Sequence, residues 1–460
     1  MIMEKLGIGG NGRHFVRGER PFFWLGDTAW RLFAALDNEQ SRVYLQNRAD
    51  KGFNAVLAVL LSRVTYHAAE NSRVEILYGD MQEFISAENE PYWAHVENVV
   101  AMGREAGLYM ALLPVWGSFA KEGFINIDNA ADYMDFLCKR FNKYENIIWL
   151  LGGDIRGDKN ADMWDICGAR LRENMPDGLI GFHPFGRTSS SYWFHNRDWL
   201  DFNMFQSGHR RYDQRNLSEW DEGAAGEPWH GEDNWRYVCA DLGKSPQKPT
   251  LDGEPSYEQI PQGLHDGSQP FWQDFHIRRY GWWAALAGAA GHVYGHNAVM
   301  QMYGTGTAAA YSVADAWDVA LHHAGAGQMG ILRDIMEEID FANCRPMQEI
   351  FGNGAGDGHE YICALGNCEN IVVYNYSGRD FCVNLPFFAD GWWLDPAGGG
   401  RSYFGRIAPG EAVLTPPVKK TGHNDWVLIL GRVDIMGSYG FSRRFFANRE
   451  ADDDAYPKVR

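Results

Sequence analysis

Residues 147–157 read IIWLLGGDIRG, an apolar run followed by two glycines and the carboxyl side chain of Asp154. Ile147–Leu151 has the length and composition of a buried strand. The two glycines let the backbone turn tightly, so that Asp154 is presented beyond the strand's carboxyl end. This stretch therefore predicts a strand that delivers an acid to one edge of a sheet.

The same pattern recurs through the first 345 residues, where short apolar runs alternate with longer amphipathic segments. One run, NAVLAVLL, is continuously apolar, as expected of a strand covered on both faces. Strands are predicted at Phe22–Asp27, Asn54–Leu61, Tyr109–Leu113, Ile147–Leu151, Leu179–His183, Phe202–Gln206, Pro249–Asp252 and His292–Tyr294. Helices are predicted at Asn38–Lys51, Tyr92–Glu105, Ala130–Phe141, Trp272–Ala289 and Val313–Ile339. Eight strands with helical spacers favour a (β/α)8 TIM barrel of the α/β class, although a doubly wound sheet would share much of the pattern.

After Cys344 the helical spacers disappear, and short strand-like runs are separated by Gly, Asn, Asp and Pro. These runs are His359–Leu365, Asn370–Tyr376, Phe381–Asn384, Trp392–Leu394 and Trp426–Leu430. The change predicts a small antiparallel β-sandwich. We expect the barrel over residues 1–345, the sandwich over 346–436 and a tail over 437–460, with apolar Met347, Ile350 and Phe351 forming a rigid junction between barrel and sandwich.

The composition disfavours several classes of partner. A formal net charge of −18 argues against nucleic acid and against a polybasic membrane contact. A neutral carbohydrate is the simplest substrate, and an anionic glycan would require arginines gathered locally. Some of the 18 Trp residues could line a sugar-binding cleft, although most are expected in the core.

The absence of metal-binding, signal-peptide and membrane-spanning patterns in the sequence sets the expectations for cofactors and cellular location. The seven scattered cysteines form neither a disulfide framework nor a zinc motif, and no HExxH occurs, so neither metal nor cofactor is expected. Met1–Phe15 has no apolar core of a signal peptide, and no run of eighteen apolar residues occurs. We therefore expect a cytoplasmic protein without a membrane contact; its oligomeric state is not encoded in these patterns.

Two acids follow predicted strands on opposite sides of the expected barrel. Asp154 follows strand four and Glu254 follows strand seven. Because barrel strands end at one common mouth, both carboxyl groups should meet there. Glycoside hydrolysis needs such a pair, one acid to protonate the leaving oxygen and one carboxylate to attack or stabilise the sugar cation. Spacing alone leaves a structural salt bridge as the alternative.

Other polar and aromatic residues near the predicted strand ends are candidates for substrate contact. They are Asp27, Trp116, His183, His209, Tyr257, His296 and Asn297. Structural roles stay open beside these: Asp27 could cap the next segment, Trp116 could pack in the core, and strand-end histidines often have structural partners. Tyr257 could also donate a hydrogen bond to the Glu254 anion.

The segments WLGDTAW (24–30), IIWLLGGDIRG (147–157) and LDGEPSYE (251–258) resemble the apiosidase-like hydrolases, glycoside hydrolase family 140 and its relatives. The likeness covers nearly the whole chain. The C-terminal segments GWWLDPAGGG and DWVLIL are similar to a small sandwich named for collagen binding. The resemblance implies that Asp154 is the acid/base and Glu254 the nucleophile. In a retaining enzyme their carboxyl groups would lie about 5–6 Å apart.

The expected activity is removal of a terminal sugar from an oligosaccharide or glycoside. Characterised members of the family are exported enzymes acting on pectic side chains; this chain is expected to act on an imported substrate, with a furanoside such as apiose among the candidates. Exo action is predicted because Ser62–Glu90, Tyr192–Trp199 and Asn216–Trp235 could wall the mouth into a pocket. Two alternatives are a non-catalytic carbohydrate-binding protein on an inactive barrel and a metal-dependent hydrolase using Asp27, Asp154 and His183.

Overall fold

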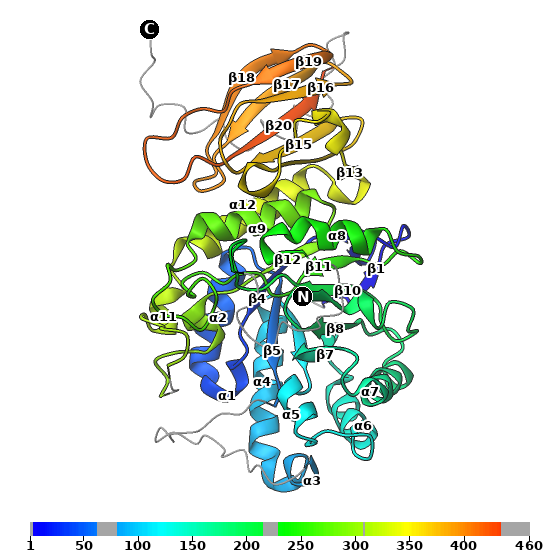
Figure 1. Ribbon diagram of the computed structural model, residues 1–460. Coiled ribbons are helices and arrows are strands. Elements are labelled where there is room, and N and C mark those ends of the chain that lie inside the picture. Colours follow the sequence, from blue (N-terminus) through cyan, green and yellow to red (C-terminus); the bar gives the residue numbers. More distant parts are fainter. Residues whose placement is uncertain (1–2, 62–80, 215–228, 307–308, 434–460) are drawn as a thin grey trace. The chain divides into compact units, whose positions relative to one another are not determined.

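The computed structural model describes residues 3–61, 81–214, 229–306 and 309–433. The chain divides into two compact units, Met1–Ala342 and Asn343–Arg460. Figure 1 follows the first unit from blue to yellow-green and the second from yellow to red. The proposed tail, 437–460, lies outside the described residues.

The first unit is the predicted (β/α)8 barrel. Its eight parallel strands are β4 (Trp24–Thr28), β5 (Ala55–Val59), β6 (Tyr109–Leu113), β7 (Ile147–Ile155), β8 (Ile180–Pro184), β10 (Asn203–Gln206), β11 (Thr250–Asp252) and β12 (Gly291–Tyr294). All eight predicted strands are confirmed. They pair in the order β8-β7-β6-β5-β4-β12-β11-β10, and β8 contacts β10 to bring the two ends together. The short strand β9 (Thr188–Ser189) pairs antiparallel with β10.

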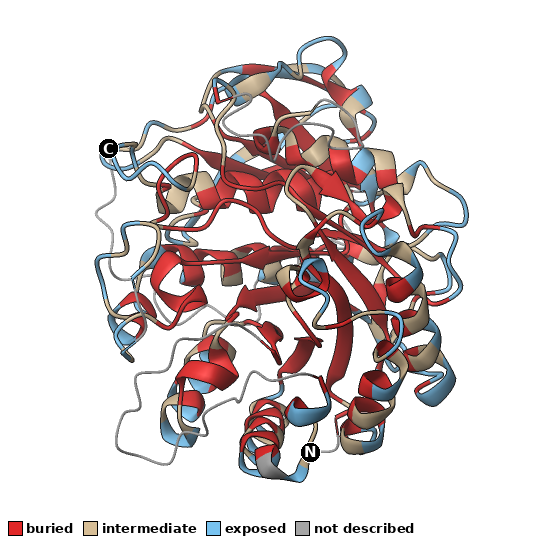
Figure 2. Cartoon of the chain, turned by 60° about the horizontal axis from the view of Figure 1, so that its bottom comes forward, coloured by how far each residue is buried: buried red, intermediate tan, exposed pale blue. Residues whose placement is uncertain are grey.

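Nearly every residue of these strands is buried, as Figure 2 shows in red. Burial on both faces explains the continuous apolar runs, because each strand is enclosed by the barrel interior and by the outer helices. Asn54 fixes the start of β5: its side chain accepts the Leu25 N–H at 2.8 Å and donates to the Phe23 carbonyl at 2.8 Å. The Asn54 side chain therefore fixes the start of β5 against the backbone at the start of β4.

The helices of the barrel unit lie outside the strands (Figure 1). They are α1 (Leu32–Ala35), α2 (Asn38–Asp50), α3 (Met81–Phe84), α4 (Glu90–Glu105), α5 (Gly117–Lys121), α6 (Ala130–Phe141), α7 (Ala161–Asn174), α8 (Asn234–Leu242), α9 (Asp274–Leu286), α10 (Asn297–Met300), α11 (Trp317–Ala320) and α12 (Ala324–Glu338). A capping box starts α2, since Gln40 N–H donates to Asp37 Oδ1 at 2.8 Å while the Gln40 side chain accepts the Asp37 N–H.

The barrel differs from the sequence-based expectation in several of its helices. The single helix predicted at Val313–Ile339 is wrong: α11 and α12 are separated by a turn at 321–323. His323 in that turn contacts His296 at 2.9 Å and Asp315 at 3.3 Å. These contacts with other segments stabilise the turn between the two helices. Helix α7 was not predicted, because Gly168 interrupts its apolar pattern. A Cβ on Gly168 would lie 2.3 Å from the Trp199 indole, so the glycine makes room for that ring.

The first residues also form an unpredicted three-stranded antiparallel sheet. Its strands are β1 (Leu6–Ile8), β2 (Phe15–Arg17) and β3 (Arg20–Phe22). Phe15 on β2 is fully buried, with its ring centroid 5.5 Å from Trp24 and 5.3 Å from Phe202. Both partners stand at the amino ends of barrel strands, so this sheet packs against the end of the barrel opposite the strand carboxyl ends.

The second unit contains the predicted antiparallel sandwich. A six-stranded sheet has the order β13-β14-β15-β20-β17-β18, and β16 pairs with β19. The bounds are β13 (Arg345–Pro346), β14 (Ile362–Gly366), β15 (Asn370–Asn375), β16 (Phe381–Leu385), β17 (Ala389–Leu394), β18 (Arg401–Ile407), β19 (Gly410–Leu414) and β20 (Trp426–Arg432). Strands β18 and β19 were missed, since much of both is exposed and an apolar run is lacking.

The apolar core of the second unit lies between its two sheets. Phe381, Val383 and Leu385 alternate inward along β16, and Leu428 and Leu430 of β20 join them. The junction residues Met347, Ile350 and Phe351 pack in this same core. Packing in the sandwich core is therefore enough to explain why these residues are apolar. The rigid junction stays a prediction.

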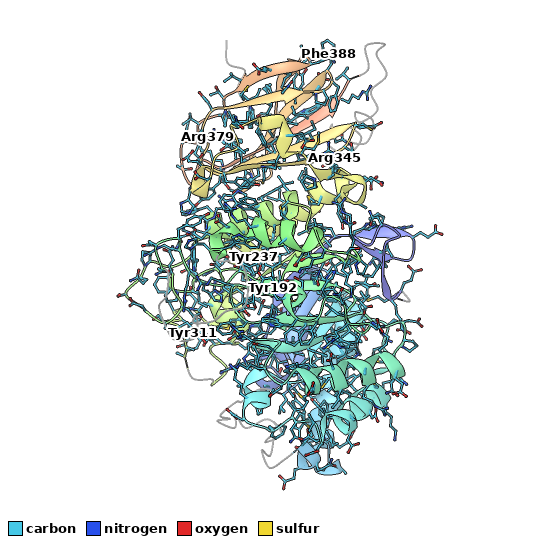
Figure 3. The ribbon with its side chains drawn as sticks, turned by 45° about the vertical axis from the view of Figure 1, so that its right-hand side comes forward. Tyr192, Tyr237, Tyr311, Arg345, Arg379 and Phe388 are labelled. Atoms are coloured by element: carbon cyan, nitrogen blue, oxygen red, sulfur yellow. The ribbon has the colours of Figure 1, made fainter. Side chains whose placement is uncertain are left out.

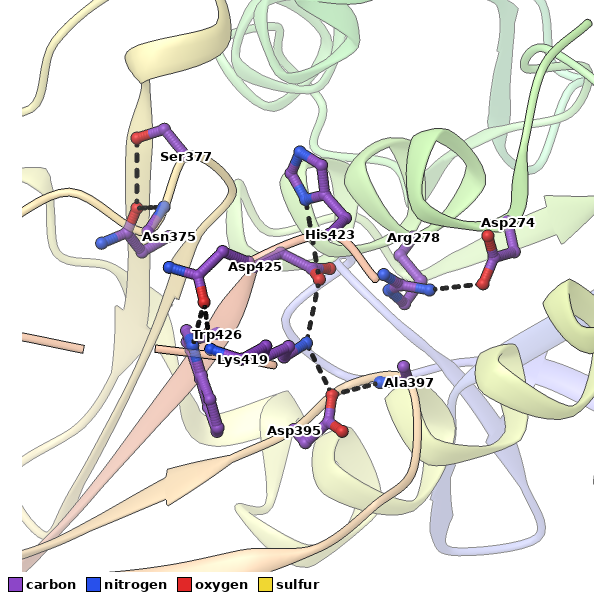
Figure 4. A network of polar contacts seen from close by, with 12 residues as sticks. Asp274, Arg278, Asn375, Ser377, Asp395, Ala397, Lys419, His423, Asp425 and Trp426 are labelled. Atoms are coloured by element: carbon purple, nitrogen blue, oxygen red, sulfur yellow. Dashed lines mark hydrogen bonds and ion pairs between the residues drawn. The ribbon is translucent and has the colours of Figure 1, made fainter. Parts of the chain in front are cut away.

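A buried carboxylate organises one end of the sandwich (Figure 4). Lys419 Nζ lies 2.7 Å from Asp395 and 3.2 Å from Asp425, and His423 Nδ1 lies 3.7 Å from Asp425. The Tyr374 hydroxyl donates to Asp425 at 3.0 Å. This network ties the loop before β20 to the loop that follows β17.

Candidate active site

A pocket of about 450 Å³ opens where the barrel strands end. Asp154 at the end of β7 and Glu254 after β11 both line it. The predicted pair therefore shares one cavity, as expected for residues beyond the carboxyl ends of barrel strands. Of the other candidates, Trp116, His209 and Tyr257 also line the pocket.

The backbone around Asp154 adopts a conformation that the sequence GGD makes accessible. Gly152, Gly153 and Asp154 have φ of 89°, 102° and 52°, all in the region that favours glycine. A Cβ on Gly152 would lie 2.4 Å from the His183 carbonyl oxygen, and one on Gly153 would lie 2.8 Å from Trp116. The backbone of the two glycines thus passes close to His183 and Trp116 just before Asp154. Asp154 itself has a backbone conformation that is strained for a residue with a side chain.

Two histidines hold the Glu254 carboxylate. His209 Nε2 forms a hydrogen bond with Oε1 at 3.0 Å. His183 Nε2 lies 3.2 Å from Oε2. Burial by itself would raise the pKa of Glu254, but the interactions with His183 and His209 outweigh it and lower the pKa to about 2. Glu254 is therefore an anion at neutral pH.

The pKa of Asp154 moves in the opposite direction. Burial is the largest cause of its rise and the Glu254 charge adds to it, whereas His183, Lys121 and His209 oppose it. The Asp154 backbone N–H also donates to His183 Nδ1 at 3.4 Å, so His183 contacts the backbone of one acid and the carboxylate of the other. One pocket thus holds an ionised carboxylate beside a carboxyl group that favours its proton, a pairing typical of acid–base chemistry.

Aromatic side chains form part of the pocket wall. Trp30 and Trp116 both line it, with ring centroids 5.0 Å apart, and Trp30 meets the His183 ring edge-on at 5.3 Å. Tyr257 packs edge-on against His209 at 4.8 Å. Among the described residues, the hydrogen bond expected from Tyr257 to Glu254 is absent; the two histidines take that position instead.

Asp27, expected to contact a substrate, is not among the residues that line this pocket. It is fully buried, and its Oδ2 accepts hydrogen bonds from Arg48 Nε and the Tyr44 hydroxyl, both at 2.6 Å. The Arg48 guanidinium lies over the rings of Tyr44 and Phe53 at 5.6 and 5.4 Å. Asp27 therefore belongs to a buried ion pair that joins β4 to α2.

Replacing Arg48 with Ala should lower the free energy of unfolding by about 3–5 kcal/mol, because the Asp27 charge would remain buried without its partner. Chemical denaturation followed by tryptophan fluorescence measures the change. The matched control is Arg42→Ala on the same helix, where the exposed Arg42 pairs with exposed Glu105 at 3.4 Å. That control should cost less than about 1 kcal/mol. Equal losses in both variants would contradict the structural role of the Asp27–Arg48 pair.

His296 and Asn297, also expected to contact a substrate, are likewise not among the residues that line this pocket. His296 Nδ1 accepts the Ala298 N–H at 3.1 Å and so caps α10. The Asn297 side chain donates to the carbonyl oxygens of Gln259 and Tyr311, each at 2.8 Å. Both residues fix loops around the pocket. His183 is also not among the lining residues, although it contacts the Glu254 carboxylate and the Asp154 backbone N–H.

The pocket also contains residues that sequence reasoning did not select. These include Trp30, Lys121, Phe185, Arg187, Gln206, Arg210, His265, Met300 and Tyr311. Trp30 belongs to the quoted motif WLGDTAW, and Arg187 and Arg210 follow strands five and six, so strand-end position could have found them. Tyr311 stands in a long loop and carried no such signal. Lys121, Arg187 and Arg210 supply the local positive charge that an anionic glycan would need.

The predicted walls differ in part from the observed ones. Residues 62–80 and 215–228 of two predicted wall segments lie outside the described residues. Tyr192–Trp199 contributes nothing to the lining; residues 185–187, 207–210 and 264–265 do. Over the described ranges, no three His, Cys, Asp or Glu side chains are grouped so that they could hold a metal ion. Nor is any described helix both long and apolar enough to span a bilayer.

Comparison with known proteins agrees with a catalytic barrel followed by a small second domain. Residues 10–343 match the family model "Apiosidase-like, catalytic domain", and residues 346–431 match "Putative collagen-binding domain of a collagenase". A solved structure named as a glycoside hydrolase is 34% identical, covering 93% of this chain and 97% of that chain, with a TM-score of 0.82. A glycoside hydrolase family 5 structure from Bacteroides vulgatus is 34% identical over 93% of this chain and 92% of that chain, with a TM-score of 0.84. No curated protein matches the chain.

Proposed function

The chain belongs to the apiosidase-like family and is a glycosidase, and from this premise we propose that it removes a terminal sugar by a retaining mechanism. Asp154 is the acid/base and Glu254 the nucleophile in this proposal. The substrate is an oligosaccharide or a glycoside, with furanosides such as apiosides among the sugars to be tested.

The observation that carries the proposal is the opposite shift of two pKa values within one pocket. The pKa of Asp154 is raised, chiefly by burial, while the histidines beside Glu254 hold its pKa near 2. A retaining glycosidase needs one protonated carboxyl group and one carboxylate at the start of its cycle. Because the two acids occupy different surroundings, their pKa values shift in the directions that the two proposed roles require.

The cycle has two steps. In the first, Asp154 gives its proton to the glycosidic oxygen as Glu254 attacks the anomeric carbon, which releases the leaving group and forms a glycosyl ester on Glu254. In the second, Asp154 takes a proton from water as that water attacks the anomeric carbon and frees Glu254. The two displacements restore the original anomeric configuration. His183 and His209 hold Glu254 throughout, and their contacts favour its carboxylate as the leaving group of the second step.

Shape and charge of the pocket support the substrate class. The aromatic faces of Trp30 and Trp116 suit an apolar sugar face, and a pocket of about 450 Å³ has room for one or two sugar rings. Lys121, Arg187 and Arg210 would favour a substrate that carries a negative group. The first screen should therefore pair neutral aryl pyranosides and furanosides with oligosaccharides that contain a uronate.

Proton NMR of the earliest product should show the same anomeric configuration as the substrate. The reason is that two displacements at one carbon cancel their inversions. Spectra recorded before the product mutarotates measure its anomeric configuration. In the same experiment, an oligosaccharide substrate should release monosaccharide from its end, which tests exo action. An inverted first product would contradict Glu254 as nucleophile, and predominant mid-chain cleavage would contradict exo action.

A further inference from the structure

The loop of residues 309–312 contributes a side chain to the pocket that contains the two acids. This loop connects α10 with α11, and Tyr311 lines the same pocket as Asp154 and Glu254 (Figure 3 labels it on the barrel unit). Its ring lies 5.8 Å from that of His265, another lining residue. Burial raises the pKa of the Tyr311 phenol, and the charges of Asp154 and Glu254 raise it further. The hydroxyl is therefore a proton-bearing donor within electrostatic reach of both acids.

The backbone of this loop is held in a strained conformation. Tyr311 and Ser312 have φ of 54° and 52°, a region that residues with a side chain seldom adopt. Such strain persists only where surrounding contacts fix it, and it is concentrated at functional sites. At this loop the contacts come from two buried amide side chains.

Asn297 and Gln301 supply those contacts. Asn297 donates to the Tyr311 carbonyl at 2.8 Å, while Gln301 accepts the Ala310 N–H at 2.9 Å and donates to the Ala310 carbonyl at 3.2 Å. Gln301 also donates to Asn297 Oδ1 at 2.7 Å, so the two amides orient each other. Both side chains are buried, which makes the arrangement rigid.

The same amide reaches the loop that bears the nucleophile. Asn297 Nδ2 also donates to the Gln259 carbonyl at 2.8 Å, five residues beyond Glu254. Gln259 itself has φ of 60°, and the Glu258 N–H is bonded to the Gly295 carbonyl at 2.9 Å. One buried side chain thus sets the Tyr311 loop and the Glu254 loop relative to each other.

We propose that Tyr311 is a further catalytic residue, whose phenol donates a hydrogen bond to the sugar held between Asp154 and Glu254, and that Asn297 and Gln301 are positioning residues for it. The inference rests on the proposed roles of the two acids. A donor fixed in place before substrate arrives strengthens its bond as charge develops on the sugar, so it acts mainly on the transition state. Asn297, expected from the sequence to touch substrate, acts instead through Tyr311.

The test compares Tyr311→Phe with Tyr303→Phe on the best aryl glycoside from the screen. Tyr303 lies in the same loop region but does not line the pocket. Tyr311→Phe removes only the hydroxyl, so we expect kcat/KM to fall roughly 10- to 100-fold, with KM changed much less than kcat. Tyr303→Phe should stay within about twofold of the unmodified enzyme. An unchanged kcat/KM in Tyr311→Phe would overturn the inference.

A double-mutant cycle tests the positioning role. Asn297→Ala should lower kcat/KM by itself and lower it by a smaller factor in the Tyr311→Phe background, because the part of its effect that acts through the Tyr311 phenol is already lost there. Circular dichroism and thermal unfolding confirm that each variant is folded. Fully additive losses would overturn the role of Asn297. Failure of this inference differs from failure of the proposed function: an active Glu254→Gln variant contradicts the latter whatever the Tyr311 variants do.

Discussion

Replacing Glu254 with Gln should lower kcat/KM by roughly 10⁴-fold or more at every pH tested. The amide has the shape of the carboxylate and can still accept the hydrogen bond from His209, so the pocket should keep its form. It cannot attack the anomeric carbon to form the glycosyl ester. Because the glutamine amide has no group that ionises to a nucleophile in the accessible pH range, raising the pH should not restore any activity in the variant.

Initial rates with an activated aryl glycoside measure this loss, and Glu105→Gln, an exposed acid at the end of α4, is the matched control. A second variant, Glu254→Gly, sharpens the result. It leaves space for azide, which should attack from the vacated side and give a glycosyl azide of inverted configuration. Residual activity of Glu254→Gln within tenfold of the unmodified enzyme would contradict the nucleophile assignment.

Replacing Asp154 with Asn should lower kcat/KM by an amount that depends on the leaving group of the substrate. Glycosides with poor leaving groups need the proton, so their kcat/KM should fall roughly 10²- to 10⁴-fold. Aryl glycosides with very acidic phenols need no proton and should keep most of their kcat/KM. Their second step still lacks a base, so a glycosyl ester should accumulate on Glu254 and be visible by mass spectrometry after peptide digestion.

The pH profile gives an independent measure of Asp154. Activity of the unmodified enzyme requires Asp154 protonated and Glu254 ionised, so kcat/KM should fall below about pH 2 and again as the pH rises through the raised pKa of Asp154. Asp154→Asn should lose the fall at high pH for activated substrates. Azide should accelerate this variant and yield a glycosyl azide of retained configuration. Equal loss on activated and natural substrates, in a folded variant, would contradict the acid/base assignment.

The eight strands and the two acids could be predicted because their signals are local. A strand enclosed in a barrel must be apolar along its length, and residues 54–61 and 147–151 show this in the sequence itself. Gly152 and Gly153 likewise mark a tight turn before Asp154 without reference to any other element. Position beyond a strand's carboxyl end then placed Asp154 and Glu254 in one pocket, since all parallel strands of a barrel end at the same mouth.

The partners of polar side chains could not be predicted in this way, because they come from distant segments. Asp27 lies near the carboxyl end of its strand, as Asp154 does, yet its carboxylate pairs with Arg48 on α2 and does not line the pocket. Asn297 follows the last strand but turns toward the loops of Gln259 and Tyr311.

The sequence by itself determined the strands and the positions of the acids, since burial on both faces and tight turns constrain neighbouring residues directly. Only the tertiary structure decided that His183 and His209 meet at Glu254 and that Tyr311 reaches the pocket. Those contacts, and the pKa values that depend on them, exist only once segments far apart in the chain are packed together and water is excluded between them.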